Sequence, residues 1–503
     1  MVYRRPPPLI PALVACTTAG LLALLSSTGM VGQRAVFSLL TLLLLIYLGI
    51  EIARVRRVQP EMWVLNPVVV ASVLTFGLYF VLSNVLFFLP AETIRAVGLV
   101  PDVTPAMVKL MWLVVLSAIA MWTGYWLPVA SRLSSPAIQR AVSRWFSVSD
   151  KPRKLALPVL VGISVTARFL QIKLGVFGYS SNYARLIEMG SVTQYLAMGA
   201  SFGSVALVVA SLANFSGHPN PGMRAWFICV LLLEVMFGLL SGFKSQVAMP
   251  FVIVGVCKYL KSGKLPKVWL LWFFAALMVG YAVIEPFRAE KNSTDFHGTS
   301  AADIIDLFIV SRSNNASVGN STPVWVSLMA RSSYSYVGSL GVAYKDENHD
   351  LPQGSPDFLR NIALAPAYAY IPRLLLDKPV GNIGLWYTQV VVGPHDSESS
   401  TAMSPITYLY FAGGTVAVFI GFLCFGLIQK VLVLLIRPTL GSARALVYLS
   451  ILPTVTSIDS AVDGIVVTIF RMIPLLFLLQ YFIYQRGQGK VFPAAGPMNK
   501  GIR

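Results

Sequence analysis

Several arginines and lysines stand apart from the basic loops that hold most of the positive charge. Arginine presents a planar fork of donors that fits a phosphate group with two hydrogen bonds at once. The set consists of Arg168, Lys173, Arg185, Lys244, Arg288, Arg312, Arg331, Arg360, Arg373 and Lys378. These cations predict a site for an anion, and beside a bilayer such an anion is most naturally the phosphate of a lipid carrier.

Three members of this set have the strongest case for a function. Lys244 occupies the short turn SGFKSQ, where a cation contributes nothing to membrane insertion, and Arg288 and Arg373 lie next to rigid prolines. The alternative for each cation is a structural role, in which it reaches lipid headgroups or pairs with an acid of a loop. We assign Arg288 and Arg373 to catalysis. The residues assigned to substrate binding are Lys244, Arg312, Arg331, Lys378, Arg168 and the aromatic Tyr408.

Aromatic residues are interleaved with these cations. Their amphipathic rings suit the faces of sugars, and they suit a belt at the membrane interface equally well. They are Tyr334, Tyr336, Tyr344, Tyr368, Tyr370, Trp386, Tyr387, Tyr408 and Tyr410. His395, in GPHDSESS, is the candidate general base, and an exposed histidine without a catalytic role is the alternative. The four histidines form no metal-binding motif, so the sequence predicts neither a metal site nor a cofactor.

Glu234 and Arg471 are charged residues inside apolar stretches. Charges in that setting are costly and usually have partners. Counted from the outer ends of their spans, at about 1.5 Å per residue, the two lie at similar depth. We therefore expect an ion pair between them, with either a structural role or a place on the path of the substrate.

The elements that must position these residues are membrane helices. A chain of 503 residues with 56% hydrophobic and 12% charged residues is not an ordinary soluble protein. A helical span needs about 20 apolar residues to cross the hydrocarbon core. The sequence therefore predicts an all-α polytopic membrane protein. Its expected spans, about twelve, lie near 9–29, 33–52, 66–90, 106–130, 155–172, 192–213, 224–241, 247–261, 268–285, 405–430, 443–458 and 462–484.

Positive charge falls in every second loop between these spans. The formal net charge is +18, and membrane proteins keep Lys and Arg in cytoplasmic loops, which explains this charge better than nucleic-acid binding does. All the basic loops share one side if both termini are cytoplasmic. They lie before residue 9 and within 54–57, 132–154, 258–267, 430–444 and 486–490.

One long outer segment, 286–404, breaks the alternation of spans and short loops. It is polar and aromatic, with helical patterns at 301–312 and 323–344. We expect short helices that lie on the membrane surface or partly re-enter it, over a cavity between the spans. The predicted parts of the chain are nine spans in 1–285, the extracytoplasmic segment 286–404, three spans in 405–485 and a cytoplasmic tail in 486–503.

The end of this segment and the following span carry a recognisable order of motifs. IPRLLLDKP (371–379) is followed by VGNIG, by SESSTAMSP (397–405) and by ITYLYFAGGTVAVFIGFLCFGLI (406–428). Together with the basic turn SGFKSQ and the twelve-span layout, this order resembles the O-antigen and exopolysaccharide polymerases, the Wzy-type polymerases of oligosaccharide repeat units. Two departures are Lys244 where arginine is more usual, and the extended Phe-Ala-Gly-Gly in place of an aromatic–glycine pair.

The resemblance implies a metal-independent glycosyltransferase of the C type in the inner (cytoplasmic) membrane. Its donor would be a glycan on polyprenyl pyrophosphate and its acceptor the next lipid-linked repeat unit. A chain-length regulator and a flippase are further candidate partners. Arg373 and Lys378 match the Pro-Arg and Lys-Pro elements of the family, and Lys244 matches the basic turn. Arg288, Arg312 and Arg331 enter by position only.

Three other functions remain open at this point. An O-antigen ligase, which moves glycan to lipid A, also needs a large outer loop and an arginine-rich site. A transporter or flippase predicts repeated halves and charges lining a path at both faces, and the polar residues here are concentrated on one side. A structural partner of other envelope proteins is the third.

Overall fold

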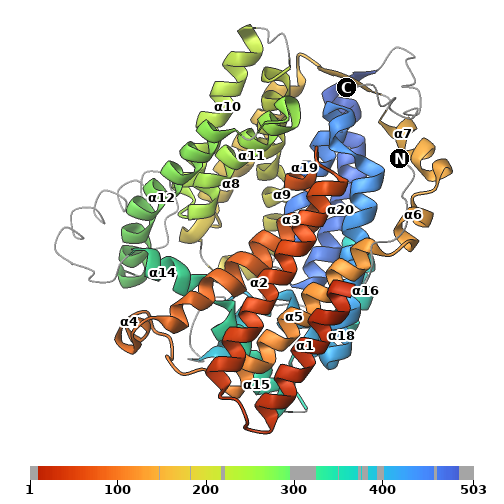
Figure 1. Ribbon diagram of the computed structural model, residues 1–503. Coiled ribbons are helices and arrows are strands. Elements are labelled where there is room, and N and C mark those ends of the chain that lie inside the picture. The colour runs from red at the N-terminus through yellow and green to blue at the C-terminus, as the bar shows by residue number, and fades with distance from the viewer. Residues whose placement is uncertain are drawn as a thin grey trace.

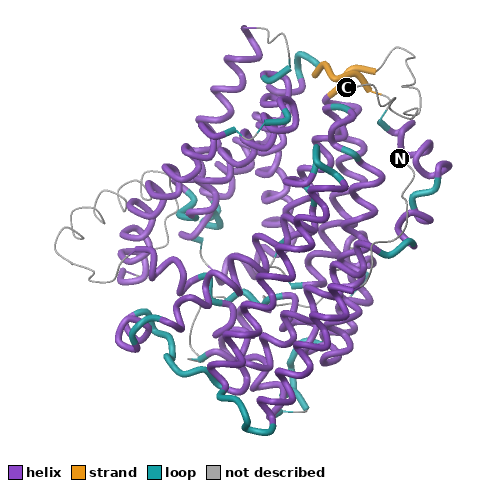
Figure 2. The backbone as a smooth tube through the Cα atoms, viewed as in Figure 1, coloured by secondary structure: helices purple, strands orange, loops and turns teal. Residues whose placement is uncertain are grey.

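The computed structural model describes the chain from residue 10 to residue 486 with several gaps, and it is almost entirely helical (Figure 1). In this part of the chain the strands are β1 (Val148–Pro152) and β2 (Tyr484–Arg486), which pair antiparallel (Figure 2). The described residues are 10–146, 148–181, 183–216, 221–264, 266–294, 324–348, 350–371, 375–376, 383–393, 401–457 and 461–486.

Eight helices of the described part are long and apolar enough to cross a membrane. This confirms the predicted class, an all-α membrane protein. Six are single helices: α2 (Gln33–Val58), α5 (Pro105–Trp126), α8 (Ala156–Lys173), α10 (Pro221–Leu240), α18 (Pro405–Ile436) and α20 (Val462–Ile483). The other two are α9 (Tyr183–Asn214) and the continuous run of α3 (Pro67–Ala71), η2 (Ser72–Leu82) and η3 (Ser83–Phe88).

The four remaining predicted spans are helices at the expected places, but they are shorter or more polar. The apolar parts of α1 (Ile10–Ser27) and α12 (Lys267–Thr294) fall below the length of a span. α19 (Ser442–Thr456) has 15 residues, about 22 Å at 1.5 Å per residue, against a hydrocarbon core of about 30 Å. α11 (Lys244–Ser262) carries lysines near both ends.

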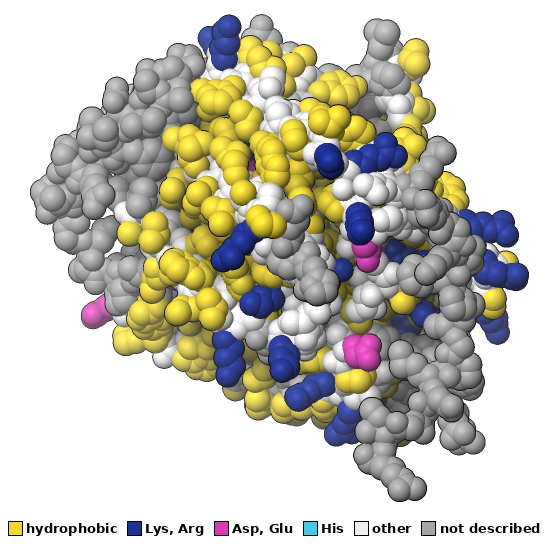
Figure 3. Space-filling model, turned by 90° about the horizontal axis from the view of Figure 1, so that it is seen from above, with side chains coloured by type: hydrophobic (Ala, Val, Ile, Leu, Met, Phe, Trp, Pro, Cys, Tyr) yellow, Lys and Arg dark blue, Asp and Glu magenta, His cyan; other side chains and the backbone are white. Residues whose placement is uncertain are grey.

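Basic loops that are far apart in the sequence meet at one end of the molecule. The backbone N–H of Arg153 donates to the carbonyl of Ile483 (2.7 Å), next to the β1–β2 pair. Ser442 donates its backbone N–H to Asp150 Oδ1 (2.6 Å), and Lys261 Nζ donates to Ser442 Oγ (3.3 Å). Figure 3 views this basic end from above, with many Lys and Arg side chains and few acids. The loops at 132–154, 258–267 and 430–444, predicted to share a side, therefore share an end.

Helices from the long segment pack at the opposite end, which we call the loop end. They are α14 (Val324–Arg331), α15 (Tyr334–Glu347), α16 (Phe358–Tyr370), α17 (Ile383–Tyr387) and η6 (Thr388–Val392). α15 lies on α5, and α16 lies on α20 and α18. Figure 1 shows α4 (Ala91–Ala96) and α15 at this end, away from the strands.

Two large hydrophobic clusters form most of the interior. The first joins α1, α2 and α5 to the first half of α18 and to α15, and the second joins α8, α9, α10, α11 and α19. α18 and α20 contribute to both clusters, so they tie the two parts together. α5 and α18 approach most closely where Gly426 faces the carbonyl of Met121, which is the small-residue contact typical of membrane helices.

One boundary differs from the prediction. α12 continues as a helix to Thr294, nine residues beyond the predicted end of its span at residue 285. The reason is that Ala289, Glu290 and Lys291 favour helix, and Pro286 interrupts only one backbone hydrogen bond. Arg288 therefore lies on a helix and not in a loop.

Candidate functional site

Lys244 is the first residue of α11 and follows a tight turn. The turn is held by Ser241, whose hydroxyl accepts the backbone N–H of Phe243 (3.1 Å) and whose carbonyl accepts the backbone N–H of Tyr179 (2.7 Å). The ring of Tyr179 also meets that of Phe243 edge-on, with centroids 6.2 Å apart. The segment around residue 179 therefore fixes where α11 begins.

The position of Lys244 concentrates positive charge. A helix N-terminus carries a partial positive charge, so a lysine there is unfavourable unless an anion lies near. The first turn of α11 contains no acidic residue. Lys244 and the N-terminus of α11 thus place two positive charges together, an arrangement that suits an anion.

α12 passes this turn and carries a second predicted cation, Arg288, further along. The backbone of Gly280 approaches Lys244, because a Cβ built on Gly280 would lie 3.8 Å from the Cα of Lys244. Arg288 is eight residues further along α12, about 12 Å at 1.5 Å per residue. Its backbone is helical, and its side chain lies outside the described part of the structure.

Arg168, a predicted binding residue on α8, is engaged in a buried ion pair with Glu234 of α10. Arg168 Nη1 donates to Glu234 Oε1 (2.6 Å) and Nη2 donates to Oε2 (2.9 Å), with side-chain exposures of 12% and 8%. Ser204 Oγ on α9 also donates to Oε2 (3.4 Å), and the guanidinium lies 4.8 Å from the ring of Phe237. The pair thus joins three membrane helices.

The predicted pair between Glu234 and Arg471 is wrong. Both oxygens of Glu234 accept hydrogen bonds from Arg168, while Arg471 on α20 donates to the carbonyls of Ala369 (3.0 Å) and Tyr368 (3.1 Å). Equal depth along two spans does not determine which helix faces meet. Arg471 instead satisfies the last carbonyls of α16, where a cation also complements the helix dipole.

A second polar group lies at the loop end, and two of its members, Lys109 and Asp346, were not among the residues predicted from the sequence. Lys109 Nζ on α5 pairs with Asp346 Oδ2 on α15 (2.6 Å), and the hydroxyl of Tyr410 on α18 donates to Asp346 Oδ1 (2.5 Å). Lys109 also lies 5.2 Å from the centre of the Tyr410 ring. Asp346 is 39% exposed, so this carboxylate is open to the surroundings while two helices hold it.

Tyr408, two residues before Tyr410 on α18, lies in a cluster of aromatic rings. Its centroid is 5.0 Å from that of Phe358, which in turn lies 5.5 Å from Trp386 and 5.2 Å from Phe411. Tyr408 is fully buried. We therefore place it among the residues that support the site, because its ring has no exposed face in this structure.

A hydrogen bond also fixes α17 on α15. The hydroxyl of Tyr387 donates to the carbonyl of Val337 (2.7 Å). Burial raises the pKa of the Tyr387 phenol, so the donor keeps its proton. The described helices of the long segment are thus held by specific polar contacts as well as by aromatic packing.

Several predicted site residues cannot be placed. Arg331 is the last residue of α14, and its side chain lies outside the described residues. The predicted residues that lie wholly outside the described part are Arg312, Arg373, Lys378 and His395. Within the described ranges, no three His, Cys, Asp or Glu side chains form a group that could hold a metal ion.

Lys109 and Asp346 carried weak signals in the sequence. Lys109 is a cation in the second turn of a span, at the end remote from the basic loops, where the charge rule disfavours it in the predicted topology. Asp346 lies in KDENHD, a polar run without a distinctive spacing. The two are 237 residues apart, and only the packing of α15 on α5 brings them together.

Buried ion pairs, apolar helices and a polar loop end together define a polytopic helical membrane protein. Residues 163–443, more than half of the chain, match a family described as a domain of unknown function, DUF8712, and the chain belongs to that family. The matched stretch contains every site residue predicted from the sequence, whereas Lys109 and Arg471 lie outside it. No curated protein and no solved structure matches the chain.

Proposed function

We propose that this protein polymerises lipid-linked oligosaccharide repeat units at the outer face of the inner membrane. The proposal includes a twelve-span topology with both termini and the basic end in the cytoplasm. The loop end then faces outward, together with the segment 286–404. The substrates are glycans on polyprenyl pyrophosphate, and no metal ion or nucleotide takes part.

The placement of Lys244 is the observation that carries this proposal. A lysine at the positive end of a helix, in a turn held by hydrogen bonds to a neighbouring segment, is a suitable holder for a diphosphate. The turn lies at the end of α11 opposite to Lys261, which contacts the basic end. Lys244 therefore belongs to the face that becomes extracytoplasmic in the proposed topology.

The proposed reaction transfers the donor glycan from its pyrophosphate carrier to a hydroxyl of the acceptor. A hydroxyl of the acceptor attacks the anomeric carbon of the donor glycan, and the bond between that carbon and the pyrophosphate oxygen breaks. Polyprenyl pyrophosphate leaves with the electron pair, and Lys244, Arg288 and Arg373 stabilise the charge that grows on it. The proton of the hydroxyl passes to His395 or to water. Because pyrophosphate is a good leaving group, a strong base is unnecessary.

The loop end offers groups that suit a sugar. Asp346 is an exposed acceptor held by Lys109 and Tyr410, and half-buried rings of Tyr344 and Trp386 lie in the adjoining aromatic cluster. Carboxylates bind sugar hydroxyls, and aromatic faces stack on sugar rings. These groups support binding of the acceptor glycan at the loop end.

Lysines at the two ends of α11 allow a matched test. Lys244→Ala removes the cation of the held turn, and Lys264→Ala removes an exposed lysine just beyond the other end of the helix. We expect Lys244→Ala to abolish long-chain glycan in cells while single lipid-linked units accumulate, and Lys264→Ala to leave the chain-length distribution unchanged. Normal polymer from the Lys244 variant, expressed at equal level, would contradict the proposal.

Reconstitution separates polymerisation from the other functions. Purified protein in liposomes with lipid-linked repeat units, and no other energy source, should produce glycans of more than one unit on the carrier. Transfer only to added lipid A would identify a ligase. Movement of the units across the bilayer without growth would identify a flippase.

A further inference from the structure

A groove runs along the basic end of α2, far from the proposed catalytic site. Its volume is about 710 Å³, and the residues that line it are Gly49, Ile52, Ala53, Arg56, Arg57, Pro60 and Trp63. Gly49, Ile52, Ala53 and Arg56 recur at the helical spacing, so they lie on one face of α2. Between Gly49 and Arg56 this face runs for about 10 Å. The groove therefore has an apolar wall and a cationic end.

The position of the groove is that of a membrane interface. α2 is one of the apolar spans, and the following segment packs on the basic end through Glu61, whose carbonyl accepts the hydroxyl of Tyr259 on α11 (3.2 Å). Trp63, in the short helix η1 (Trp63–Leu65), lies 5.5 Å from the guanidinium carbon of Arg56. Tryptophan prefers the level of the lipid headgroups. The cationic end of the groove therefore lies where lipid phosphates are.

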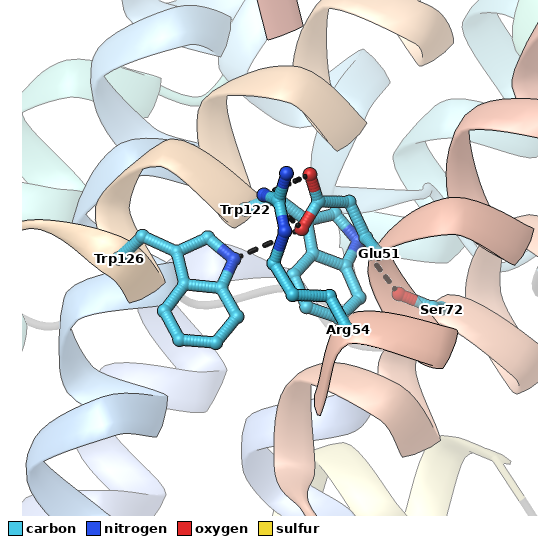
Figure 4. A network of polar contacts seen from close by, with 5 residues as sticks. All are labelled: Glu51, Arg54, Ser72, Trp122 and Trp126. Atoms are coloured by element: carbon cyan, nitrogen blue, oxygen red, sulfur yellow. Dashed lines mark hydrogen bonds and ion pairs between the residues drawn. The ribbon is translucent and has the colours of Figure 1, made fainter. Parts of the chain in front are cut away.

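Three arginines end α2, and one of them is already neutralised. Arg54 donates to both oxygens of Glu51 (2.8 and 3.1 Å), and Glu51 also accepts the indole N–H of Trp126 (2.9 Å), as Figure 4 shows. Glu51 is 2% exposed, so this pair belongs to the interior.

Arg56 and Arg57 differ from Arg54. Both are exposed, and within the described chain neither donates a hydrogen bond or forms an ion pair, although the guanidinium of Arg56 lies against the ring of Trp63. Their donors remain available at the edge of the groove, and Glu61, the acid of the adjoining turn, is not among the lining residues.

We propose that this groove binds an anionic glycerophospholipid from the leaflet at the basic end. The phosphodiester accepts hydrogen bonds from Arg56 and Arg57, and one acyl chain lies along Gly49, Ile52 and Ala53. Charge complementarity selects the phosphate, because two unpaired guanidinium groups meet no carboxylate in the groove. The apolar wall selects a lipid over a free anion, because it adds burial of hydrocarbon that a phosphate ion lacks.

The test compares two ways of removing the same positive charge. The full-length protein is purified in detergent with equal amounts of phosphatidylglycerol and phosphatidylcholine, and bound lipids are measured by native mass spectrometry. Arg56→Gln/Arg57→Gln is compared with Arg140→Gln/Arg144→Gln on α7 (Pro136–Trp145), an exposed helix at the same end. The amount of bound phosphatidylglycerol should fall about thirtyfold in the groove variant and less than about twofold in the α7 variant.

A third variant tests the apolar wall without a change of charge. Gly49→Leu introduces a side chain whose Cβ would have no neighbouring atom within 4 Å, so we expect it to fill the groove without disturbing the fold. It should lower binding of phosphatidylglycerol, and excess inorganic phosphate should not displace the lipid from the native protein. Equal losses in the two arginine variants would overturn the proposal in favour of general surface charge. Displacement by phosphate, with no effect of Gly49→Leu, would overturn it in favour of a free anion.

Discussion

Gly203→Ala tests whether the buried pair of Arg168 and Glu234 holds the α8–α9–α10 bundle together. A Cβ at residue 203 would lie 2.1 Å from Glu234 Oε1 and 2.7 Å from Ser164 Oγ, whereas ordinary contacts begin at 3.4 Å. The carboxylate must therefore move by more than an ångström. That movement breaks the 2.6 Å contact with Arg168, because both side chains are almost fully buried and have little room to follow.

The expected cost follows from these distances. Breaking a buried ion pair costs about 3–5 kcal/mol, and replacing a helical glycine by alanine returns about 0.5–1 kcal/mol. We expect a net loss of about 2–4 kcal/mol in the free energy of unfolding. The control is Gly162→Ala on α8, where no atom lies within 4 Å of the added methyl group, and it should stabilise the protein slightly.

Thermal unfolding in one detergent, followed by near-ultraviolet circular dichroism, measures the two variants side by side. A second-site change sharpens the test, because Glu234→Asp withdraws the carboxylate by one methylene. Combined with Gly203→Ala, it should destabilise less than the sum of the single changes. If Gly203→Ala unfolds at the same temperature as Gly162→Ala, the pair tolerates displacement and the reasoning is refuted.

Three further predictions concern α18, α15 and α20. Gly414 has φ +63° and ψ −153°, a conformation available essentially to glycine, so Gly414→Ala should lower the free energy of unfolding by about 1–3 kcal/mol. Gly413→Ala, at φ −175°, should lower it less, and thermal unfolding of the two variants measures the difference. Asp346→Asn breaks the ion pair with Lys109, which is about 40% exposed, and should change the free energy of unfolding by less than about 1 kcal/mol. If the carboxylate binds the acceptor, the same variant should make shorter glycans. Arg471→Gln loses the charge-assisted hydrogen bonds to the last carbonyls of α16, so proteolysis near residue 371 should be faster, as measured by gel electrophoresis of the fragments. An unchanged rate of cleavage there would contradict the role of Arg471 in anchoring α16.

Hydropathy and charge were sufficient to predict the class of fold and that the loops at 132–154, 258–267 and 430–444 lie at one end. Backbone polar groups must be satisfied within the bilayer, so long apolar stretches have no option but helix. The alternation of basic and non-basic loops then assigns each loop to an end, as the contact of Asp150 with Ser442 illustrates. These signals are local in the sequence, which is why they can be interpreted without coordinates.

The partners of the charged residues could not be predicted in the same way. Glu234 and Arg471 have similar predicted depth in the membrane. An ion pair also requires that two helix faces meet, and hydropathy does not predict which faces pack together. Lys109 and Asp346 meet across 237 residues for the same reason. Gly203 gave no sign of its importance, because a glycine on a membrane helix is common, and only the carboxylate beside it shows why no side chain fits.

The buried ion pair and the candidate site belong to one chain of contacts. The guanidinium of Arg168 lies on the ring of Phe237, and that ring meets Phe177 with centroids 6.4 Å apart. Two residues later, Tyr179 donates its backbone N–H to Ser241 in the turn that precedes Lys244. We therefore expect a shift of α8 against α10 to reach the start of α11 through these contacts. If Lys244 holds a diphosphate, loss of the ion pair should lower polymer formation at temperatures where the protein is still folded, because the cation moves before the bundle unfolds.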